Sequence, residues 1–180
     1  MDKQAFKWEL LGFLATFGIG SLLHFVFEWT GRWPPAALFA AVNESTWEHL
    51  KMAFWPMILW AIIELLLIRK KQVETRNFAI AKAIGIYTTP LTIIVLFYSY
   101  LALGFASNLA SGLTFFAIGV FAGHMVSAII MSASNWSNNL AFVAIGLLIF
   151  SVFCFSLFTY LPVQNILFVD PGTGLHGIPA

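Results

Sequence analysis

Carboxylates, a histidine and a lysine gather in one short run, Asn43-Glu44-Ser45-Thr46-Trp47-Glu48-His49-Leu50-Lys51. The run lies directly before a long apolar stretch. Histidine nitrogens and carboxylate oxygens are ligands that zinc and similar divalent metals take in proteins. A catalytic metal keeps one position open for water and lowers the pKa of that water towards neutrality. The run is therefore the first candidate for a chemical site.

Two other segments carry residues of the same types. His24 and Glu28 lie near the end of an apolar stretch, and their spacing of four places them on one face of a helix. Asp170 and His176 lie in a tail whose glycines and prolines predict tight turns. We expect the three segments to converge at one end of the fold, which the composition discussed below places at one side of a membrane. The predicted metal ligands are His24, Glu28, His49, Asp170 and His176. The predicted catalytic residues are Glu44, Glu48 and Ser45, of which Glu44 and Glu48 are the candidate general bases.

The face of the first apolar stretch that carries His24 changes character with depth. Gly20 and Ser21 come next on this face, and Phe17 and Phe13 lie deeper. This order predicts a shallow cavity with an aromatic floor and disfavours a polar path through the membrane. The predicted residues that line the cavity or pack around it are Asn43, Lys51, His124 and Arg32. Midway along its own apolar stretch, His124 would lie at the deep end of the cavity or hydrogen-bond across a helix interface.

Local structure offers a competing explanation for the central run. Ser45-x-x-Glu48 matches a capping box, in which Ser45 accepts the Glu48 N–H and the Glu48 side chain reaches back to the Ser45 N–H. Glu48 and Lys51 can also pair three residues apart on a helix. The functional interpretation depends on convergence, because a capping box requires neither Glu44 nor His49.

Two further pairs of opposite charge have structural interpretations. Glu28 and Arg32 are four residues apart and can pair on one helix face. Glu64 and Lys82 lie near the facing ends of two successive apolar stretches. We interpret them as a structural ion pair, buried or interfacial, with a proton or ion pathway as the alternative.

The composition decides what kind of element must position these residues. Of the 180 residues, 60% are hydrophobic and 9% are charged, whereas a soluble domain has about 25% charged residues. A soluble fold of this length has too little interior to hide so much apolar surface. The sequence therefore predicts an all-α integral membrane bundle surrounded by membrane lipids. The net charge of +1 predicts no nucleic-acid partner.

Five apolar stretches reach the roughly 20 residues that a spanning helix needs. Pro90 predicts a kink or tilt in the third, and a segment over residues 33–42, opened by Pro34-Pro35, is too short to span and predicts an interfacial or re-entrant helix. Gly119-x-x-x-Gly123 predicts close helix packing, within the chain rather than between copies. We expect one transmembrane domain over residues 1–180, with spans at 8–29, 47–68, 78–105, 113–131 and 140–161 and a tail at 162–180.

Basic residues in the connecting loops predict the orientation in the membrane. Lys3 and Lys7 precede the first span, and a basic cluster at residues 69–76 follows the second. The opposite side carries only Arg32 and Lys51. This imbalance predicts a multi-pass protein of the cell membrane with its N-terminus in the cytoplasm. The C-terminus and the polar residues would then lie outside.

The run Asn43–Lys51, the Phe54-Trp55-Pro56 that follows it and the Val169–Gly174 segment resemble a signature of uncharacterised small bacterial polytopic membrane proteins. This resemblance implies a membrane fold of this size and no particular activity. A more distant likeness is to alkaline-ceramidase-like membrane hydrolases, whose Ser-x-x-x-His near a helix end is matched by Ser45 and His49. Those enzymes have more spans and a His-x-x-x-His in the last one, which this chain lacks.

Three functions remain open from the sequence. The first is a metal-dependent hydrolase or related lipid-modifying enzyme, with a small-molecule or lipid substrate entering from the outer leaflet and zinc as a typical metal. The second is a solute-binding or transport subunit that uses the same cavity, binds a cationic solute and works with partner subunits. The third is a scaffold whose polar cluster joins the helix ends.

Overall fold

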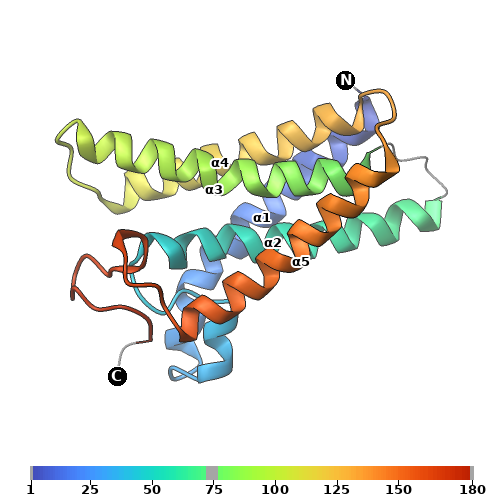
Figure 1. Cartoon of the computed structure of the whole chain (residues 1–180). Helices are drawn as coiled ribbons and strands as arrows, with labels where there is room; N and C mark the ends of the chain where they lie inside the picture. The colour runs from blue at the N-terminus through green and yellow to red at the C-terminus, as the bar shows by residue number, and fades with distance from the viewer. Residues whose placement is uncertain (1, 72–76, 179–180) are drawn as a thin grey trace.

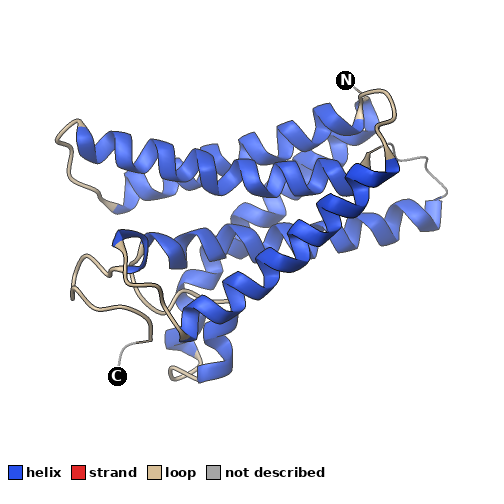
Figure 2. Ribbon diagram, viewed as in Figure 1, coloured by secondary structure: helices blue, strands red, loops and turns tan. Residues whose placement is uncertain are grey.

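The computed structural model of the chain describes residues 2–71 and 77–178. It contains five long helices (Figure 1): α1 (Lys3–Trp29), α2 (Thr46–Lys71), α3 (Phe78–Ala102), α4 (Leu109–Met131) and α5 (Asn138–Tyr160). Two short 3₁₀ helices, η1 (Pro34–Leu38) and η2 (Ile166–Phe168), lie in the connections. All five long helices are long and apolar enough to cross a membrane. Among the described residues the elements are helices and loops without strands (Figure 2), so the predicted all-α bundle with five spans is confirmed.

Successive long helices alternate in direction, so the two termini lie at opposite ends of the bundle (Figure 1). α3 and α4 pack side by side, α1 packs against both α2 and α4, and α5 packs against α3 and η1. We call the end that holds Asp2 and the α4–α5 loop the N-terminal end. The opposite end holds η1 and the tail from residue 161, and we call it the C-terminal end. All the helices that carry predicted site residues therefore contribute to one bundle.

Polar caps set several helix boundaries that the apolar stretches alone do not. The capping residues are Asp2 for α1, Asn108 for α4 and Ser137 for α5, and each side chain accepts a backbone N–H of the first turn. These three helices consequently begin before the apolar stretches at 8–29, 113–131 and 140–161. α3 is continuous through Pro90 and ends at Ala102, just before Gly104 with its positive φ of 85°.

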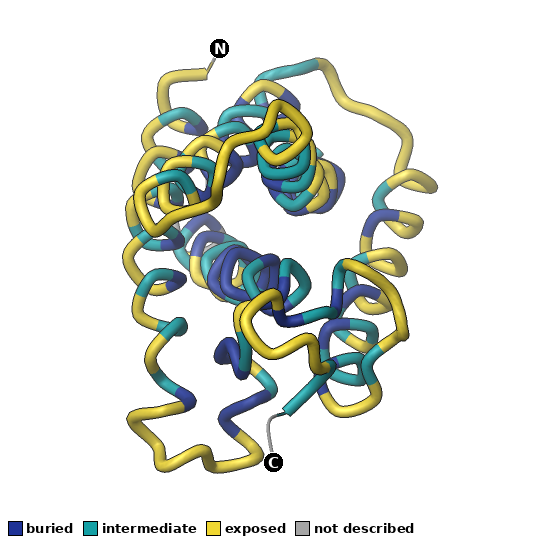
Figure 3. Tube along the Cα trace, turned by 90° about the vertical axis from the view of Figure 1, so that its left-hand side faces the viewer, coloured by how far each residue is buried: buried dark blue, intermediate teal, exposed yellow. Residues whose placement is uncertain are grey.

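Apolar side chains cover both the inside and the outside of the bundle. Figure 3 shows buried residues where helices face one another and exposed residues on the outward faces. The outward residues include Leu14, Leu91, Phe142, Ile149 and Phe153. An apolar surface of this extent is stable against lipid tails and unstable against water. The distribution of exposed residues thus supports the membrane assignment independently of helix length.

Two glycines allow α3 and α4 to approach closely. A Cβ atom built on Gly85 would lie 2.6 Å from the Gly123 carbonyl oxygen, and one built on Gly123 would lie 2.5 Å from the Gly85 carbonyl oxygen. Both clashes are with backbone atoms, which cannot rotate away. The Gly119-x-x-x-Gly123 motif therefore packs within the chain, as expected from the sequence.

Replacement of Gly123 by valine should lower the temperature of thermal unfolding in detergent. The added side chain forces α3 and α4 apart, and overpacking of this kind costs about 1–3 kcal/mol. Unfolding can be followed by the fluorescence of the tryptophans. Gly112→Val on the same helix is the matched control, because a Cβ there meets no atom within 4 Å. Equal unfolding temperatures for the two variants would contradict the close α3–α4 contact.

Candidate functional site

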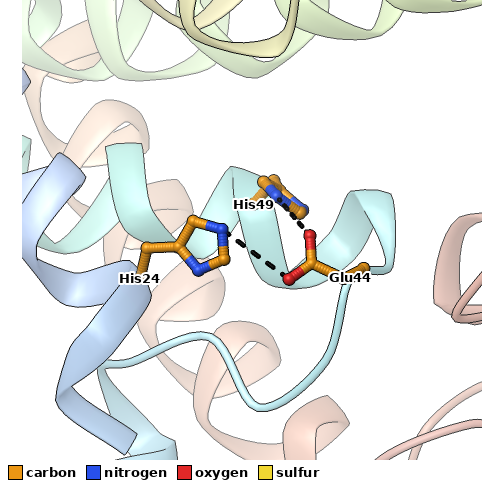
Figure 4. Close-up of side chains that lie close together, drawn as sticks. All are labelled: His24, Glu44 and His49. Carbon is orange, nitrogen blue, oxygen red and sulfur yellow. Dashed lines mark ion pairs between the residues drawn. The ribbon is translucent and has the colours of Figure 1, made fainter. Parts of the chain in front are cut away.

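Three polar side chains from three segments meet at the C-terminal end of the bundle (Figure 4). His24 belongs to α1, Glu44 to the loop before α2, and His49 to the first turn of α2. The Nε2 atom of His24 lies 3.7 Å from Oε1 of Glu44, and Nε2 of His49 lies 3.5 Å from Oε2. The two imidazole rings meet edge to face with their centroids 5.5 Å apart. Each carboxylate oxygen of Glu44 therefore faces a different imidazole.

Local hydrogen bonds hold the loop that carries Glu44. The side chain of Asn43 accepts the Ser45 N–H at 2.8 Å through Oδ1 and donates to the Gly177 carbonyl oxygen at 2.8 Å through Nδ2. The backbone N–H of Glu44 donates to Oδ2 of Asp170 at 3.4 Å. The tail is therefore packed against this loop and limits where the Glu44 side chain can reach.

The His49 ring is oriented by its own helix turn. Its Nδ1 atom lies 2.9 Å from the Ser45 carbonyl oxygen, which can only accept a hydrogen bond. Nδ1 therefore carries the proton in the neutral ring, and the lone pair of Nε2 faces Glu44. Metal-binding histidines are typically oriented in this way, by donating the other ring N–H to a carbonyl or carboxylate. The His24 ring is stacked on Phe25, with centroids 5.2 Å apart.

The dimensions of this group suit a small divalent cation. Its ligand atoms all lie within 4.8 Å of one another. Four-coordinate zinc, with bonds of about 2.0–2.2 Å, places its ligand atoms about 3.3 Å apart. The His24, His49 and Glu44 side chains are 28%, 35% and 57% exposed, so one side of the group is open. Three protein ligands with an open side are typical of a catalytic zinc site rather than a structural one.

The other predicted metal ligands lie outside this group. Glu28 is exposed and pairs with Arg32, whose Nε lies 3.0 Å from Oε1 of Glu28. Asp170 accepts backbone N–H groups of its own turn at 2.7 and 3.2 Å. His176 forms an isolated antiparallel bridge with Val169. These residues share one end of the bundle, as expected, but Glu28 and Asp170 have local partners of their own, and His176 is outside the group of three.

Glu48 and Lys51 face the interior of the bundle. The Lys51 Nζ atom lies 2.5 Å from Oε2 of Glu48 and donates to the Ala37 carbonyl oxygen at 2.7 Å and to Thr159 at 2.9 Å. Oε2 of Glu48 also accepts the Val42 N–H at 3.1 Å. Both charged side chains are almost completely buried. This pair therefore joins α2, α5 and the η1 segment.

The expected roles of Ser45 and Glu48 are changed by these contacts. Only half of the expected capping box is present: Ser45 Oγ accepts the Glu48 N–H at 3.4 Å, while the Glu48 carboxylate turns away to Val42 and Lys51. A carboxylate that is neutralised and buried in this way is unsuited to act as a general base on a substrate at His24 and His49. Ser45 is likewise buried.

A second polar cluster lies inside the bundle, nearer the N-terminal end. Lys82 on α3 forms an ion pair with Glu64 on α2, and its Nζ also lies 2.5 Å from Oε1 of Glu9 on α1. On α4, Nδ1 of His124 lies 2.6 Å from Oε2 of Glu9, and the Ser127 hydroxyl donates to Oε1 of Glu9. All five side chains are buried. The cluster thus joins four helices.

Glu9 and Thr16 were not predicted from the sequence, and of the two alternatives for His124 the structure shows the hydrogen bond across a helix interface rather than the cavity. His124 faces Glu9, and its Nε2 lies 3.1 Å from the Thr16 hydroxyl oxygen. A signal was available, because the buried residues Glu9, Gly12, Thr16 and Gly20 follow the helical period along one face of α1. An acidic residue on such a small-residue face indicates a partner inside the bundle.

Comparisons with known proteins place the chain without assigning an activity. Residues 1–178 match the profile of a family of unknown function, DUF6512. No curated protein and no solved structure matches the chain. The family match agrees with the resemblance to an uncharacterised family, while the distant likeness to alkaline-ceramidase-like hydrolases has no support from these comparisons.

Replacement of Lys51 by methionine should destabilise the protein strongly. It leaves the Glu48 carboxylate buried without a cation, and breaking a buried pair in this way costs about 3–5 kcal/mol. The double variant Glu48→Gln with Lys51→Met should recover part of the loss, since the uncompensated charge is gone. Thermal unfolding in detergent measures both effects.

The matched control for this pair is Arg32→Met. It breaks the exposed pair with Glu28, which contributes at most about 1 kcal/mol. If Lys51→Met is no more harmful than Arg32→Met, the buried pair does not hold the C-terminal end together.

Proposed function

We propose that this chain, which belongs to the DUF6512 family of unknown function, is a metal-dependent hydrolase of the membrane surface. Its metal, zinc or a similar divalent ion, would bind to His24, Glu44 and His49. One observation carries the proposal: two imidazole nitrogens from different helices face the two oxygens of one carboxylate at 3.7 and 3.5 Å. Within residues 2–71 and 77–178, no other group of three potential ligands of this kind comes so close together.

The proposal is supported by the orientation of the ligands. His49 directs Nε2 to the site because Nδ1 is held by the Ser45 carbonyl. The Glu44 loop is held by Asn43 and Asp170. Ligands held in this way need little rearrangement when a metal ion binds, and such support raises metal affinity.

A divalent metal in this site would supply Lewis-acid catalysis and activate water near neutral pH. With Glu48 committed to Lys51, the proton-accepting role passes to Glu44. Its carboxylate has two oxygens, so one can bind the metal while the other accepts a proton from water. Phe25 and Trp29 stack in line with His24 and are exposed beside the site. Aromatic rings of this kind lie at the headgroup level of a membrane, so the site would open where a lipid or another amphiphilic substrate could reach it.

The purified protein should bind about one equivalent of zinc after dialysis, as measured by elemental analysis. His24→Ala, Glu44→Gln and His49→Ala should each weaken zinc binding at least about tenfold, because each removes a ligand. Glu28→Gln is the matched control, since Glu28 is a carboxylate at the same end that pairs with Arg32. Absence of zinc from the wild type, or equal loss in Glu28→Gln, would refute the site.

The open position on the metal can be tested with cobalt(II) in place of zinc. A hydroxamate should change the visible spectrum of the cobalt protein, because it enters the coordination position that a hydrolase keeps for water. A spectrum that does not respond indicates a structural metal and removes the hydrolase part of the proposal. If the three ligand variants lose stability without any change in metal content, the group is a scaffold contact.

We further propose that the N-terminal end of the bundle faces the cytoplasm. The metal site would then lie on the extracytoplasmic side of the cell membrane. Lys3, Lys7 and Lys70 lie at the N-terminal end. At the C-terminal end the exposed basic residue is Arg32, because Lys51 is buried. Basic residues are enriched on the cytoplasmic side of membrane proteins. Arg76, which also supports this orientation, lies outside the described residues.

Cysteine labelling in intact cells should report this orientation. In a Cys154→Ser background, Thr173→Cys in the tail should react with a membrane-impermeant maleimide. Ser134→Cys in the α4–α5 loop should react only after the cells are permeabilised. Both positions are exposed and lie at opposite ends of the bundle. The reverse pattern of labelling would show the opposite orientation.

A further inference from the structure

We infer that Glu9, Glu64, Lys82 and His124 form a proton-binding site inside the membrane-spanning region. The site holds one exchangeable proton, which Glu64 and His124 share. Each of the four residues belongs to a different helix, from α1 to α4. This site is separate from the proposed metal site and does not depend on it.

The burial and the number of these ionisable groups call for more than an ion pair as explanation. Glu9 and Glu64 are 0% exposed, His124 2% and Lys82 5%, although Glu9 and Lys82 lie within about 9 Å of the starts of their helices. Ionisable groups at such positions are costly and mark proton or ion sites in membrane proteins. A structural ion pair needs one acid and one base. Here a second carboxylate and an imidazole accompany the first pair.

Charge balance determines how many protons the cluster holds. Glu9 accepts hydrogen bonds from Lys82 and Ser127 and faces Nδ1 of His124. These donors stabilise the ionised form of the Glu9 carboxylate. The Lys82 ammonium group neutralises it. The cluster is then neutral only if one of the two remaining groups, Glu64 or His124, carries a proton. A net charge in so buried a site is strongly disfavoured.

Both candidate proton positions are prepared by the structure. Oε1 of Glu64 is buried and is not the oxygen that pairs with Lys82, so a proton on Oε1 leaves the ion pair through Oε2 in place. Nε2 of His124 faces the Thr16 hydroxyl. A hydroxyl donates to a neutral imidazole and accepts from an imidazolium, so the same atomic positions serve both states of the ring.

The remaining surroundings of the site are uncharged. Trp60 lies one turn before Glu64 on α2, and its uncharged indole N–H interacts with the Glu64 carboxylate. It packs beside His124 over Gly12, where a Cβ atom would lie 2.6 Å from the His124 ring. α5 carries no charged residue. The proton is therefore governed by the four named groups, with Thr16, Ser127 and Trp60 as neutral neighbours.

An aromatic layer separates this site from the proposed metal site. Thr16 and His24 are about 12 Å apart along α1, and Phe17 and Gly20 lie between them. The Phe17 and Phe116 rings have centroids 5.9 Å apart, and a Cβ atom on Gly20 would lie 2.6 Å from the Phe116 ring. The polar cluster therefore ends at this layer.

The shared proton predicts reciprocal effects of two substitutions in the purified full-length protein. Infrared spectra should show the C=O band of a buried carboxylic acid, with a shift in D₂O, and this band should persist from mildly acidic to mildly alkaline buffer because loss of the proton would leave a buried net charge. ¹⁵N spectra of histidine-labelled protein should show His124 partly as imidazolium over the same range, and the signal is identified by its loss in His124→Gln. In Glu64→Gln the carboxylic acid band should disappear and His124 should become fully neutral. In His124→Gln the band should increase, because the proton is then confined to Glu64.

Thr16→Val is the variant to use if Glu64→Gln does not fold, because it changes no charge. It removes the acceptor of the imidazolium, so the proton should move to Glu64 and the carboxylic acid band should increase. Glu28→Gln and His176→Gln lie outside the cluster and should leave both signals unchanged. Two results would overturn the inference: no carboxylic acid band in the folded wild type together with a fully neutral His124, or a His124 signal that does not respond to either Glu64→Gln or Thr16→Val.

Discussion

A charged side chain inside the membrane-spanning region must be matched by an opposite charge, because neither lipid nor a protein interior solvates it as water does. This bundle meets the requirement at two levels. Glu48 neutralises Lys51 near the C-terminal end, and Glu9 and Glu64 face Lys82 nearer the N-terminal end. Lys51 also bonds to α5 and to the η1 segment, and Lys82 joins α1, α2 and α3. The contacts that neutralise the buried charges therefore also hold the helices together.

Small residues bring the matched charges within reach of each other. Gly85 on α3 and Gly123 on α4 let their backbones approach, and Lys82 and His124 lie within one turn of these two glycines. The contact between Gly85 and Gly123 therefore determines where along the bundle the side chains of Lys82 and His124 meet Glu9 of α1. A larger residue at either glycine would separate the helices and disturb the charge pairing as well as the packing.

Interactions within one helix or between adjacent helix ends could be predicted from the sequence, and those among several helices could not. Spacing on α2 indicated the contact of Glu48 with Lys51, and depth indicated that of Glu64 with Lys82. Glu9 stands at the edge of an apolar stretch, where it resembles an interfacial residue, and its partners come from α3 and α4.

The fold shows the same division between local and long-range information. Apolar length alone predicts the number of spans. Helix starts depend on caps such as Asp2 and Asn108, which lie outside the apolar stretches. The position of His124 midway along α4 gave its approximate depth but not the helix it faces, so the sequence alone left both the cavity and a helix interface open for it.

Competition among partners explains why the candidate metal ligands are three and not more. Every carboxylate at the C-terminal end other than Glu44 has a stronger partner: Glu28 has Arg32, Glu48 has Lys51, and Asp170 has the backbone amides of its turn. Glu44 faces the imidazoles of His24 and His49 and has no lysine or arginine partner among the described residues. Its charge is therefore the least compensated of these four carboxylates. A carboxylate without a lysine or arginine partner is free to join the two imidazoles in binding a divalent cation, as proposed above. The open side of the group and the orientation of the His49 ring are the features on which that proposal depends.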